Sequence, residues 1–553
     1  MMKKVLLVAA IMTLIICATL SAANVWRVNS SGTITLNGSE FRVKGGSWFG
    51  LEGRYEIPSD ENNPRGAPME LYMGNVWWQS SNRTYDGDAR EIKNMGFNVI
   101  RLPLVPQTLD DNDPQGKDPV LKNTQSVRIQ GAFTALKTVI KACSDAGLYV
   151  LLDIHSCSNY LGWRAGRFDS KPPFADADRN NYDYKREDCS CSASGNPSGV
   201  TRIQAYDTQK WLANLKTLAG LGSSIGVDNI IGIDIFNEPW DYTWSEWKSL
   251  IDQAYEAINS VNQNILVFAQ GIGNKSEFGD GNNPNWGENL YGVRDNPPTM
   301  PKERLVFSPH TYGPSVSTQD FFADLNAQPE CRDLIEDDFG DAKCQIVINP
   351  AVLEPGWEEH FGYLRDMGYA ICIGEFGGNK DWPNKAEQRH QTRYSYLTDK
   401  TTDWQWQNAF VNYLIKRGIT DTIYWSINPE SSDTYGIYTT PYDPLNNTGG
   451  WGTWQGTDSQ KLDMLKKIWN AVRPTIGPTN TPTNTGGGSK GDVDGVGGIT
   501  ILDALKVSQY AVGTPPAGFI AANADVNCDG SINIIDALMI AQRYVGLISN
   551  FPC

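Results

Sequence analysis

One complete strand–helix unit lies in residues 229–260, NIIGIDIFNEPWDYTWSEWKSLIDQAYEAINS. Residues 229–237 are apolar and rich in isoleucine, which favours a buried strand. Residues 244–260 place apolar side chains every three or four positions, a period typical of a helix with one buried face. The strand ends on Asn237 and Glu238. This polar pair either begins a helix, with Asn237 as its N-cap, or presents a catalytic acid.

Segments of the same two kinds alternate along most of the chain. We expect eight strands, at residues 41–49, 98–103, 149–155, 229–237, 264–269, 304–310, 369–376 and 421–427. Amphipathic segments such as residues 131–147 lie between most of them. Eight successive units predict an α/β fold, a (β/α)8 TIM barrel with long loop insertions. A doubly wound open sheet is the alternative, which the lack of a Gly-x-Gly-x-x-Gly motif after the first strand disfavours.

Two of the expected insertions are rich in aromatic and arginine side chains. The first spans residues 156–201, after the third strand, and the second lies around residues 274–301. Long loops in a compact domain usually serve binding, although many such side chains merely cover the rim of a barrel. The side chains concerned are Tyr160, Trp163, Arg164, Arg167, Phe174, Tyr182, Tyr184, Trp286 and Tyr291.

The composition argues against one class of partner and suits another. The chain has 553 residues, with 47 Lys and Arg against 63 Asp and Glu, which gives a net charge of −16. This balance argues against nucleic acid, whose binding needs concentrated positive charge. The 18 Trp and 23 Tyr side chains suit stacking on sugar rings, although most Trp in a large domain belongs to the core.

The N-terminus has the pattern of a secretory signal peptide, which we expect to span residues 1–23. Lys3 and Lys4 precede an apolar run over residues 5–20, and small residues follow at 21–23. A membrane anchor is the alternative, but the apolar run is short for a span. We therefore expect a secreted, extracellular protein with no membrane attachment once the signal peptide is removed.

Nine of the ten cysteines follow this signal sequence, and an oxidising exterior permits disulfide bonds between them. Cys331 and Cys344 flank one loop and could pair. Cys372 lies in an apolar strand and is the best candidate for a buried free thiol. The possible partners of Cys157 are Cys189 and Cys191.

Polar side chains gather at the carboxyl ends of the expected strands, where barrel active sites form. Glu238 follows the fourth strand and Glu375 ends the seventh, so we expect them to face each other across the barrel mouth. Facing carboxylates suit glycosidic cleavage, because one protonates the leaving oxygen while the other attacks the anomeric carbon or activates water. The other candidates are Arg101, His155, Asn237, His310, Tyr312 and Trp425.

Six motifs at barrel spacing connect this pattern to a known family. They are NVIRLP, LLDIH, FNEPW, SPHTY, IGEFGG and IYWSINP. On these motifs the chain resembles glycoside hydrolase family 5, a family rich in cellulases. The resemblance covers nearly all of residues 24–475 and is strongest to the bacterial endoglucanase branch. The resemblance implies a retaining double displacement, with Glu238 as general acid/base and Glu375 as nucleophile.

The residues expected around the two carboxylates agree with these roles. Arg101 and the Tyr312 hydroxyl could hold the charge of an ionised Glu375. Glu238 needs a raised pKa, which apolar neighbours could provide. Those neighbours are Phe236 and Trp240.

The resemblance assigns the remaining candidates to the substrate. Asn237 would bind the sugar 2-hydroxyl, and Trp425 would lie under the sugar at the cleavage point. His155 and His310 would bind substrate or orient the carboxylates. The competing interpretation is structural, with Arg101 in an ordinary ion pair. We expect no catalytic cofactor, because the histidines are too scattered for zinc and no Cys-x-x-Cys motif occurs.

After residue 475 the composition changes to that of a linker. Residues 476–490 are rich in Thr, Pro, Asn and Gly, which predicts an interdomain linker. Residues 491–553 then contain an ungapped repeat, whose two copies begin at Asp492 and Asp525, 33 residues apart.

This repeat resembles a dockerin, the calcium-binding module that docks enzymes onto cohesin domains of a cellulosome scaffold. Each copy has the form of half an EF-hand, a calcium loop followed by a helix. Val496 stands at the fifth position of the first loop and removes one ligand there. A tail that binds nothing is the alternative. The expected ligands are Asp492, Asp494, Thr500 and Asp503 in the first loop, and Asp525, Asn527, Asp529, Asn533 and Asp536 in the second.

These features together predict a secreted endo-β-1,4-glucanase that hydrolyses cellulose as part of a cellulosome, with a cohesin domain as its protein partner. The same barrel could instead serve a mannanase, a xyloglucanase or a mixed-linkage β-glucanase. A non-catalytic carbohydrate-binding scaffold component is the rival from another class, and the presence of both Glu238 and Glu375 disfavours it.

Overall fold

The computed structural model describes most of both predicted domains. The described residues are 23–51, 83–109, 132–155, 208–239, 242–273, 282–285, 287–384, 388–429, 431, 433–441, 454–473, 490–494, 498–513, 516, 519–545 and 547–552. Outside them lie residues 1–22 of the expected signal peptide, the insertion at 156–201 and the linker up to residue 489. The chain divides into two compact units, Met1–Thr475 and Ile476–Cys553.

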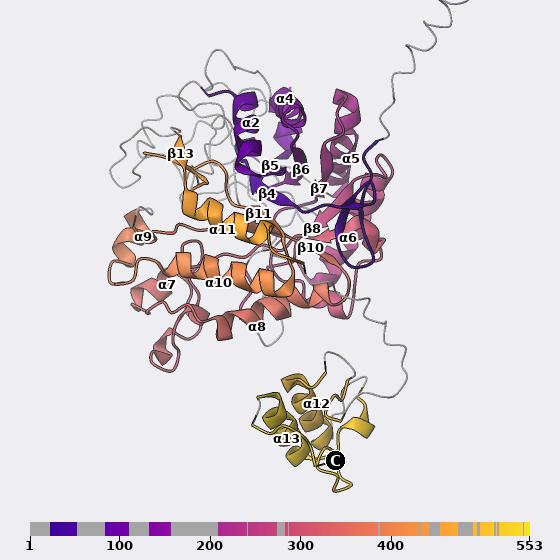
Figure 1. Cartoon of the computed structure of the whole chain (residues 1–553), viewed down its shortest axis with the longest axis vertical. Coiled ribbons are helices and arrows are strands. Elements are labelled where there is room, and N and C mark those ends of the chain that lie inside the picture. The colour runs from indigo at the N-terminus through magenta and orange to yellow at the C-terminus, as the bar shows by residue number, and fades with distance from the viewer. Residues whose placement is uncertain are drawn as a thin grey trace, which may run out of the picture. The chain divides into compact units, whose positions relative to one another are not determined.

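The first unit is built around a closed barrel of eight parallel strands, which confirms the expected fold (Figure 1). The strands follow one another around the barrel in chain order, and β11 closes it by pairing with β4. Their bounds are β4 Lys44–Ser47, β5 Val99–Leu104, β6 Tyr149–Ile154, β7 Ile230–Asp234, β8 Leu266–Ala269, β9 Leu305–Phe307, β10 Ala370–Phe376 and β11 Asp421–Tyr424.

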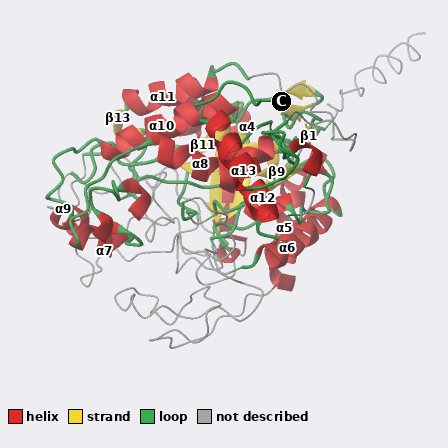
Figure 2. Ribbon diagram, turned by 90° about the horizontal axis from the view of Figure 1, so that it is seen from below, coloured by secondary structure: helices red, strands yellow, loops and turns green. Residues whose placement is uncertain are grey.

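Helices surround the barrel, and Figure 2 shows its strands enclosed among them. Their bounds are α2 Tyr85–Met95, α4 Ala132–Asp145, α5 Thr208–Ile225, α6 Trp244–Asn259, α7 Glu336–Asp341, α8 Pro350–His360, α9 Gln388–Arg393, α10 Thr402–Arg417 and α11 Ser459–Trp469. Helix α6 starts at a capping box, in which Thr243 and Glu246 each accept a backbone N–H of the other. Its apolar side then buries Trp247, Ile251 and Ile258.

A three-stranded antiparallel sheet, which the sequence did not predict, lies at the N-terminal end of the barrel. Its strands are β1 Trp26–Val28, β2 Ile34–Leu36 and β3 Ser39–Glu40. The fully buried Trp26 packs edge-on against Tyr149, the first residue of β6, and joins the core inside the barrel. This sheet covers the N-terminal end of the barrel, and barrel active sites form at the opposite, carboxyl ends of the strands.

The remaining short elements lie in the connections. They are β12 Tyr438–Thr439, β13 Gln455–Thr457, and the 3-10 helices at Pro106–Leu109, Tyr291–Arg294, Lys302–Arg304, Asp320–Phe322, Pro329–Cys331, Gly362–Arg365 and Ala521–Asn523. Among the helices of the described residues, none has the length and apolar character that crossing a membrane requires.

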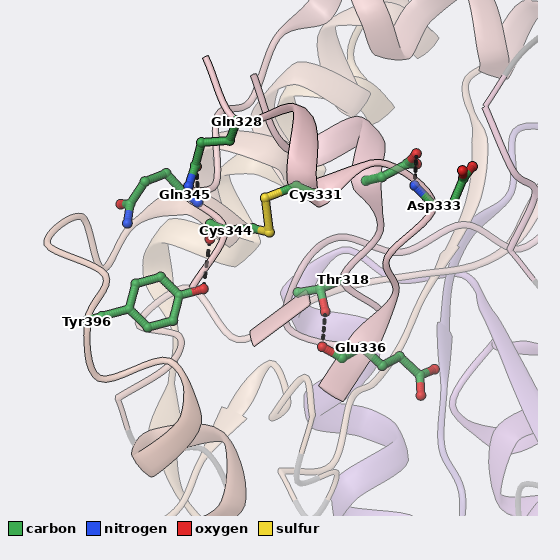
Figure 3. The surroundings of a disulfide bond; sticks show 9 residues. Thr318, Gln328, Cys331, Asp333, Glu336, Cys344, Gln345 and Tyr396 are labelled. Atoms are coloured by element: carbon green, nitrogen blue, oxygen red, sulfur yellow. Dashed lines mark hydrogen bonds between the residues drawn. A yellow bond between two sulfur atoms is a disulfide. The ribbon is translucent and has the colours of Figure 1, made fainter. Parts of the chain in front are cut away.

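The cysteines follow the expected pattern where the structure describes them. Cys331 and Cys344 form a disulfide bond, which confirms the pairing across their loop (Figure 3). The Tyr396 hydroxyl donates to the Cys344 carbonyl over 2.7 Å, which ties this loop to its neighbour. Cys372 is a buried free thiol, as predicted, and Cys143 is a second one. The possible partners of Cys157 lie outside the described residues, as does Cys157 itself.

The second unit is a small all-α domain. Its helices are α12 Ile501–Ala511 and α13 Ile534–Tyr544, and they keep the 33-residue spacing of the sequence repeat. The two helices pack together over a core of small and β-branched side chains. That core consists of Val493, Ala504, Val507, Ala524, Val526, Ala537 and Ile540.

Candidate active site

The structure brings all eight barrel candidates together at the carboxyl ends of the strands. Hydrogen bonds, ion pairs and ring contacts connect them into one cluster. Arg101 lies in β5 and Glu375 in β10, while the others follow strands: His155 after β6, Asn237 and Glu238 after β7, His310 and Tyr312 after β9, and Trp425 after β11.

Arg101 is the centre of this cluster, and its side chain is fully buried. Its Nη1 pairs with Oε1 of Glu375, and its Nη2 donates to Oδ1 of Asn237 over 2.9 Å. Two further carboxylates meet the same guanidinium. Oδ2 of Asp153 lies 3.0 Å from Nη2, and Oδ2 of Asp234 accepts from Nε over 3.1 Å. One cation therefore fixes three buried acids and the Asn237 amide.

Asp153 and Asp234 are members of the site that the sequence analysis missed. Burial raises the pKa of each to about 7, and the nearby charge of Arg101 opposes this rise. The sequence did contain a signal for these two residues, since each is the one acidic residue in an apolar strand. A buried acid is rare unless it is paired, so each could have been predicted to have a buried partner. Asp153 also links Arg101 to His155, whose Nδ1 lies 2.8 Å from its Oδ2.

Glu375 has two partners that favour its ionised form. Arg101 pairs with its Oε1, and the Tyr312 hydroxyl donates to its Oε2. Burial raises the pKa of Glu375, and the Arg101 charge and the Tyr312 hydrogen bond both act to lower it. The two stabilising groups that the sequence suggested for this carboxylate are therefore in contact with it.

Glu238 lies close to Glu375 but in a different environment. A carboxylate oxygen of Glu238 lies within 4.8 Å of one of Glu375, and its Oε1 lies 3.0 Å from Nδ1 of His310. Burial raises the pKa of Glu238 well above its usual value, and the negative charge of Glu375 raises it further. Of the apolar neighbours expected to do this, Phe236 is buried and Trp240 lies outside the described residues.

The two histidines of the site are uncharged. Burial lowers the pKa of His155 to about 3, and burial together with the charge of Arg101 lowers that of His310 well below its usual value. His310 therefore contacts Glu238 as a neutral ring and adds no positive charge that would favour the ionised carboxylate.

Trp425 lies beside aromatic neighbours at the edge of the cluster. Its ring is nearly parallel to those of Phe49 and His155, with centroids 5.0 and 5.4 Å away. Its Nε1 donates to the Ser431 hydroxyl over 3.3 Å, and only 6% of the residue is exposed. These contacts fix the orientation of the ring, and its role as a platform for sugar stays a prediction.

In the second unit, the first predicted calcium loop gathers oxygen ligands. Carboxylate oxygens of Asp492, Asp494 and Asp503 all lie within 4.8 Å of one another. Thr500, the fourth expected ligand, donates its hydroxyl to Oδ2 of Asp503 over 2.7 Å. A set made only of oxygens fits calcium. Val496, where a ligand is missing, lies outside the described residues.

In the second predicted calcium loop, donors of the loop itself form hydrogen bonds with its acidic side chains. The Gly530 N–H donates to Oδ2 of Asp525 over 3.1 Å, and Asn527 donates to Asp529 over 2.9 Å. Oδ1 of Asp536 accepts the Val526 N–H over 2.9 Å, which ties the helix start to the loop start. Asn533, the remaining expected ligand, is the N-cap of α13. Among the described residues, the acids of this loop do not gather as those of the first loop do, so calcium binding here stays a prediction from the ligand types and their spacing.

Comparison with known families agrees with both units. Residues 62–431 match the family described as Cellulase (glycosyl hydrolase family 5), and residues 490–544 match the Dockerin type I domain. Solved structures that resemble the chain include the catalytic domain of the major endoglucanase from Xanthomonas campestris pv. campestris. It has a TM-score of 0.53 at 23% identity and covers 80% of this chain and 99% of that one. An endocellulase from Pyrococcus horikoshii gives a TM-score of 0.54 at 22% identity, covering 81% and 99%. These likenesses support the fold.

Curated relatives of this chain are named as endoglucanases. Endoglucanase C of Cellvibrio japonicus is 53% identical over 464 residues, which cover 80% of this chain and 62% of that protein. This chain thus spans less than two thirds of that relative. Endoglucanase G of Acetivibrio thermocellus is 24% identical over 491 residues, which cover 78% of this chain and 69% of that protein. Since the family match extends over most of the chain, the protein belongs to glycosyl hydrolase family 5 and carries a C-terminal type I dockerin domain.

Proposed function

We propose that this protein is a secreted, retaining endo-β-1,4-glucanase that hydrolyses cellulose and is attached to a scaffold through its dockerin. The observation that carries the proposal is the pair Glu238 and Glu375, whose oxygens approach within 4.8 Å. Retaining glycosidases place their carboxyl groups about 5–5.5 Å apart, whereas inverting enzymes leave a gap of about 6.5–9.5 Å for water. The short approach supports direct attack by one carboxylate.

The asymmetry of the pair supports the assignment of roles. Glu375 is the nucleophile, because Arg101 and Tyr312 both contact it and favour its ionised form. Glu238 is the general acid, because burial and the neighbouring negative charge favour its protonated form. Two carboxyl groups of one type thus take opposite protonation states in one site.

The proposed reaction has two steps. Glu238 protonates the glycosidic oxygen while Glu375 attacks the anomeric carbon, so the C–O bond breaks and a covalent glycosyl-enzyme forms. Glu238, now ionised, takes a proton from water, which attacks the same carbon and releases Glu375. Two displacements restore the β configuration.

Asn237 is arranged to bind the sugar next to this centre. Its Oδ1 accepts hydrogen bonds from Nη2 of Arg101 and, over 3.4 Å, from Nε2 of Gln270. The amide NH2 group is thereby assigned as the group that faces the substrate, and it can donate to the sugar 2-hydroxyl. Hydrogen bonds to this hydroxyl strengthen in the transition state.

The substrate is proposed from the names of the relatives, so an activity panel tests it. We expect reducing sugar to appear fastest from soluble cellulose, and more slowly or not at all from glucomannan, xyloglucan, mixed-linkage β-glucan and xylan. The Glu375→Ala variant is the negative control, because it lacks the proposed nucleophile. A faster rate on glucomannan or xyloglucan would mean that this polysaccharide, and not cellulose, is the preferred substrate. No activity on any β-glucan would favour the non-catalytic alternative.

The dockerin is proposed to bind a cohesin domain through the starts of its two helices. Ile501 and Leu502 at the start of α12 are 47% and 55% exposed, and Ile534 and Ile535 at the start of α13 are 62% and 52% exposed. Exposed apolar pairs on so small a domain mark a protein-binding surface. The repeat places the same kind of pair beside each calcium loop.

Removing calcium should separate the two activities of the chain. A domain with so small a core depends on metal binding for much of its folding free energy, so a chelator should unfold it and abolish cohesin binding. The barrel chemistry uses no metal, and hydrolysis of soluble glucan should be unchanged. Calorimetry of cohesin binding with and without chelator, beside a reducing-sugar assay, measures both effects.

Ligand variants refine this expectation. Asp529→Ala should weaken calcium binding by at least about tenfold, because it removes a ligand, and docking should weaken with it. Val496→Ala is the matched control at the same position of the other loop, where no side-chain ligand is lost. Docking that survives the chelator, or hydrolysis that stops with it, would contradict this account of the repeat.

A further inference from the structure

The backbone of Glu238 adopts an unusual conformation that one buried side chain holds. Its φ angle is +45°, in the left-handed region that residues with a side chain rarely occupy. The Glu238 N–H donates to Oε1 of Gln270 over 2.7 Å. Gln270 follows β8, and β8 pairs directly with β7, the strand that leads to Glu238.

The amide of Gln270 has a defined orientation. Its Oε1 faces an N–H donor, while its Nε2 donates to Oδ2 of Asp234 over 2.9 Å and to Oδ1 of Asn237 over 3.4 Å. A flipped amide would set its NH2 group against the Glu238 N–H and its oxygen against the Asp234 carboxylate. The side chain therefore fits in one way only, and it is fully buried.

The surroundings of Gln270 leave little room for an alternative position. The Trp247 indole donates to the Gln270 carbonyl over 2.8 Å, which fixes its backbone. A Cβ added at Gly287 would lie 2.9 Å from Oε1 of Gln270 and 3.3 Å from Cγ of Glu238. The Gly287 backbone thus packs against both side chains at once.

We propose that Gln270 is a positioning residue that fixes the backbone of Glu238 and so directs its carboxyl group at the glycosidic oxygen. This inference rests on the proposed role of Glu238 as general acid/base. Among the described residues, Gln270 has no direct hydrogen bond to Glu375 and reaches it only through Asp234, Asn237 and Arg101. Its loss should therefore impair proton transfer far more than nucleophilic attack.

The experiment compares two substrates whose leaving groups differ in their need for an acid. For Gln270→Leu we expect kcat/KM on a soluble cello-oligosaccharide to fall by about 10²-fold, the scale for a misplacement of about 1 Å. On a dinitrophenyl cellobioside, whose leaving group needs no proton, kcat/KM should change little. Because kcat/KM reports the first chemical step, the slower second step does not obscure the comparison.

A second variant gives a signature that a structural role would not produce. Gln270→Glu keeps the shape and the acceptor oxygen, but the introduced carboxyl group can donate to Asp234 only when it is protonated. Asp234 is the titratable side chain that it contacts, Glu238 presents its backbone N–H to it, and Arg101 donates to the same oxygens of Asp234 and Asn237. The activity of this variant on the cello-oligosaccharide, taken as a ratio to that of the unaltered enzyme at the same pH, should therefore recover toward low pH and fall as the pH rises. This near-isosteric variant also decides the matter if Gln270→Leu does not fold.

Two controls make the outcomes distinct. Gln407 is also a fully buried glutamine with two side-chain hydrogen bonds, to Asp403 and Tyr424, so Gln407→Leu should affect both substrates equally. Glu238→Ala should show the same leaving-group difference as Gln270→Leu. If Glu238→Ala shows it and neither Gln270 variant does, the inference is wrong while the proposed function stands. If Glu238→Ala itself shows no difference, the role of Glu238 is wrong, and this inference fails with it.

Discussion

Glu375→Ala is expected to abolish formation of the covalent glycosyl-enzyme. Loss of a covalent nucleophile costs on the order of 10⁶-fold in kcat in a well-studied hydrolase, and a loss of similar scale is expected here. The reason is geometric, since Arg101 and Tyr312 place the two oxygens of Glu375 and no other carboxylate with both contacts occurs among the described residues. Mass spectrometry after a brief reaction with a slow fluorinated glycoside measures the adduct directly.

Glu375→Gln is the matched variant, because it keeps the size of the side chain and removes the charge. It should be equally inactive, since an amide cannot replace the carboxylate as nucleophile. Arg101 would keep Asp153 and Asp234 as partners, so the fold should survive and circular dichroism should be unchanged. An adduct on the Glu375→Ala variant would mean that another residue attacks.

The stereochemistry of the product gives an independent measurement on the unaltered enzyme. Two displacements at one carbon return the β anomer, whereas a single attack by water gives the α anomer. Proton NMR of the first anomer released distinguishes them before mutarotation. An initial α signal would show that Glu375 activates water and would remove it from the role of nucleophile.

The sequence predicted the barrel because its strands are signalled by eight apolar runs, with amphipathic segments between most of them. It also placed the candidate site residues, since a parallel barrel brings the carboxyl ends of all its strands to one mouth. Glu238 and Glu375 could therefore be expected near each other although they lie far apart in the chain. The short sheet formed by β1, β2 and β3 was missed, because strands of two or three residues give too little pattern to detect.

What the sequence could not show is how the buried polar groups share their hydrogen bonds. Asp153, Asp234 and Gln270 lie on three neighbouring strands or their ends, and their contacts depend on strand register. The same is true of the left-handed backbone of Glu238, which no glycine marks in the sequence. The sequence thus located the two candidate carboxylates and several of their partners, whereas Asp153, Asp234 and Gln270 emerged only with the structure.

The second large effect is expected at Glu238. Glu238→Ala should slow hydrolysis of cellulose by about 10²–10⁴-fold, the usual contribution of a general acid. The first step on a dinitrophenyl cellobioside should be spared, because its leaving group departs without a proton. The second step should remain slow on both substrates, since no base remains to activate water, and the glycosyl-enzyme should accumulate. A burst of dinitrophenol followed by a slow phase measures this pattern.

Azide should then rescue the second step in the Glu238→Ala variant. Azide needs no general base, so it should accelerate the slow phase and yield a β-glycosyl azide.

The pH profile should report on the same carboxyl group. In the unaltered enzyme, activity on cellulose should fall as pH rises through the pKa of Glu238, which burial and the charge of Glu375 set well above the usual range. It should fall again as pH drops through the pKa of Glu375, where the nucleophile gains a proton. In Glu238→Ala, kcat/KM for the aryl substrate should keep the low-pH fall and lose the high-pH one, because only the nucleophile still titrates. Equal loss on both substrates without rescue by azide would place the proton donor elsewhere.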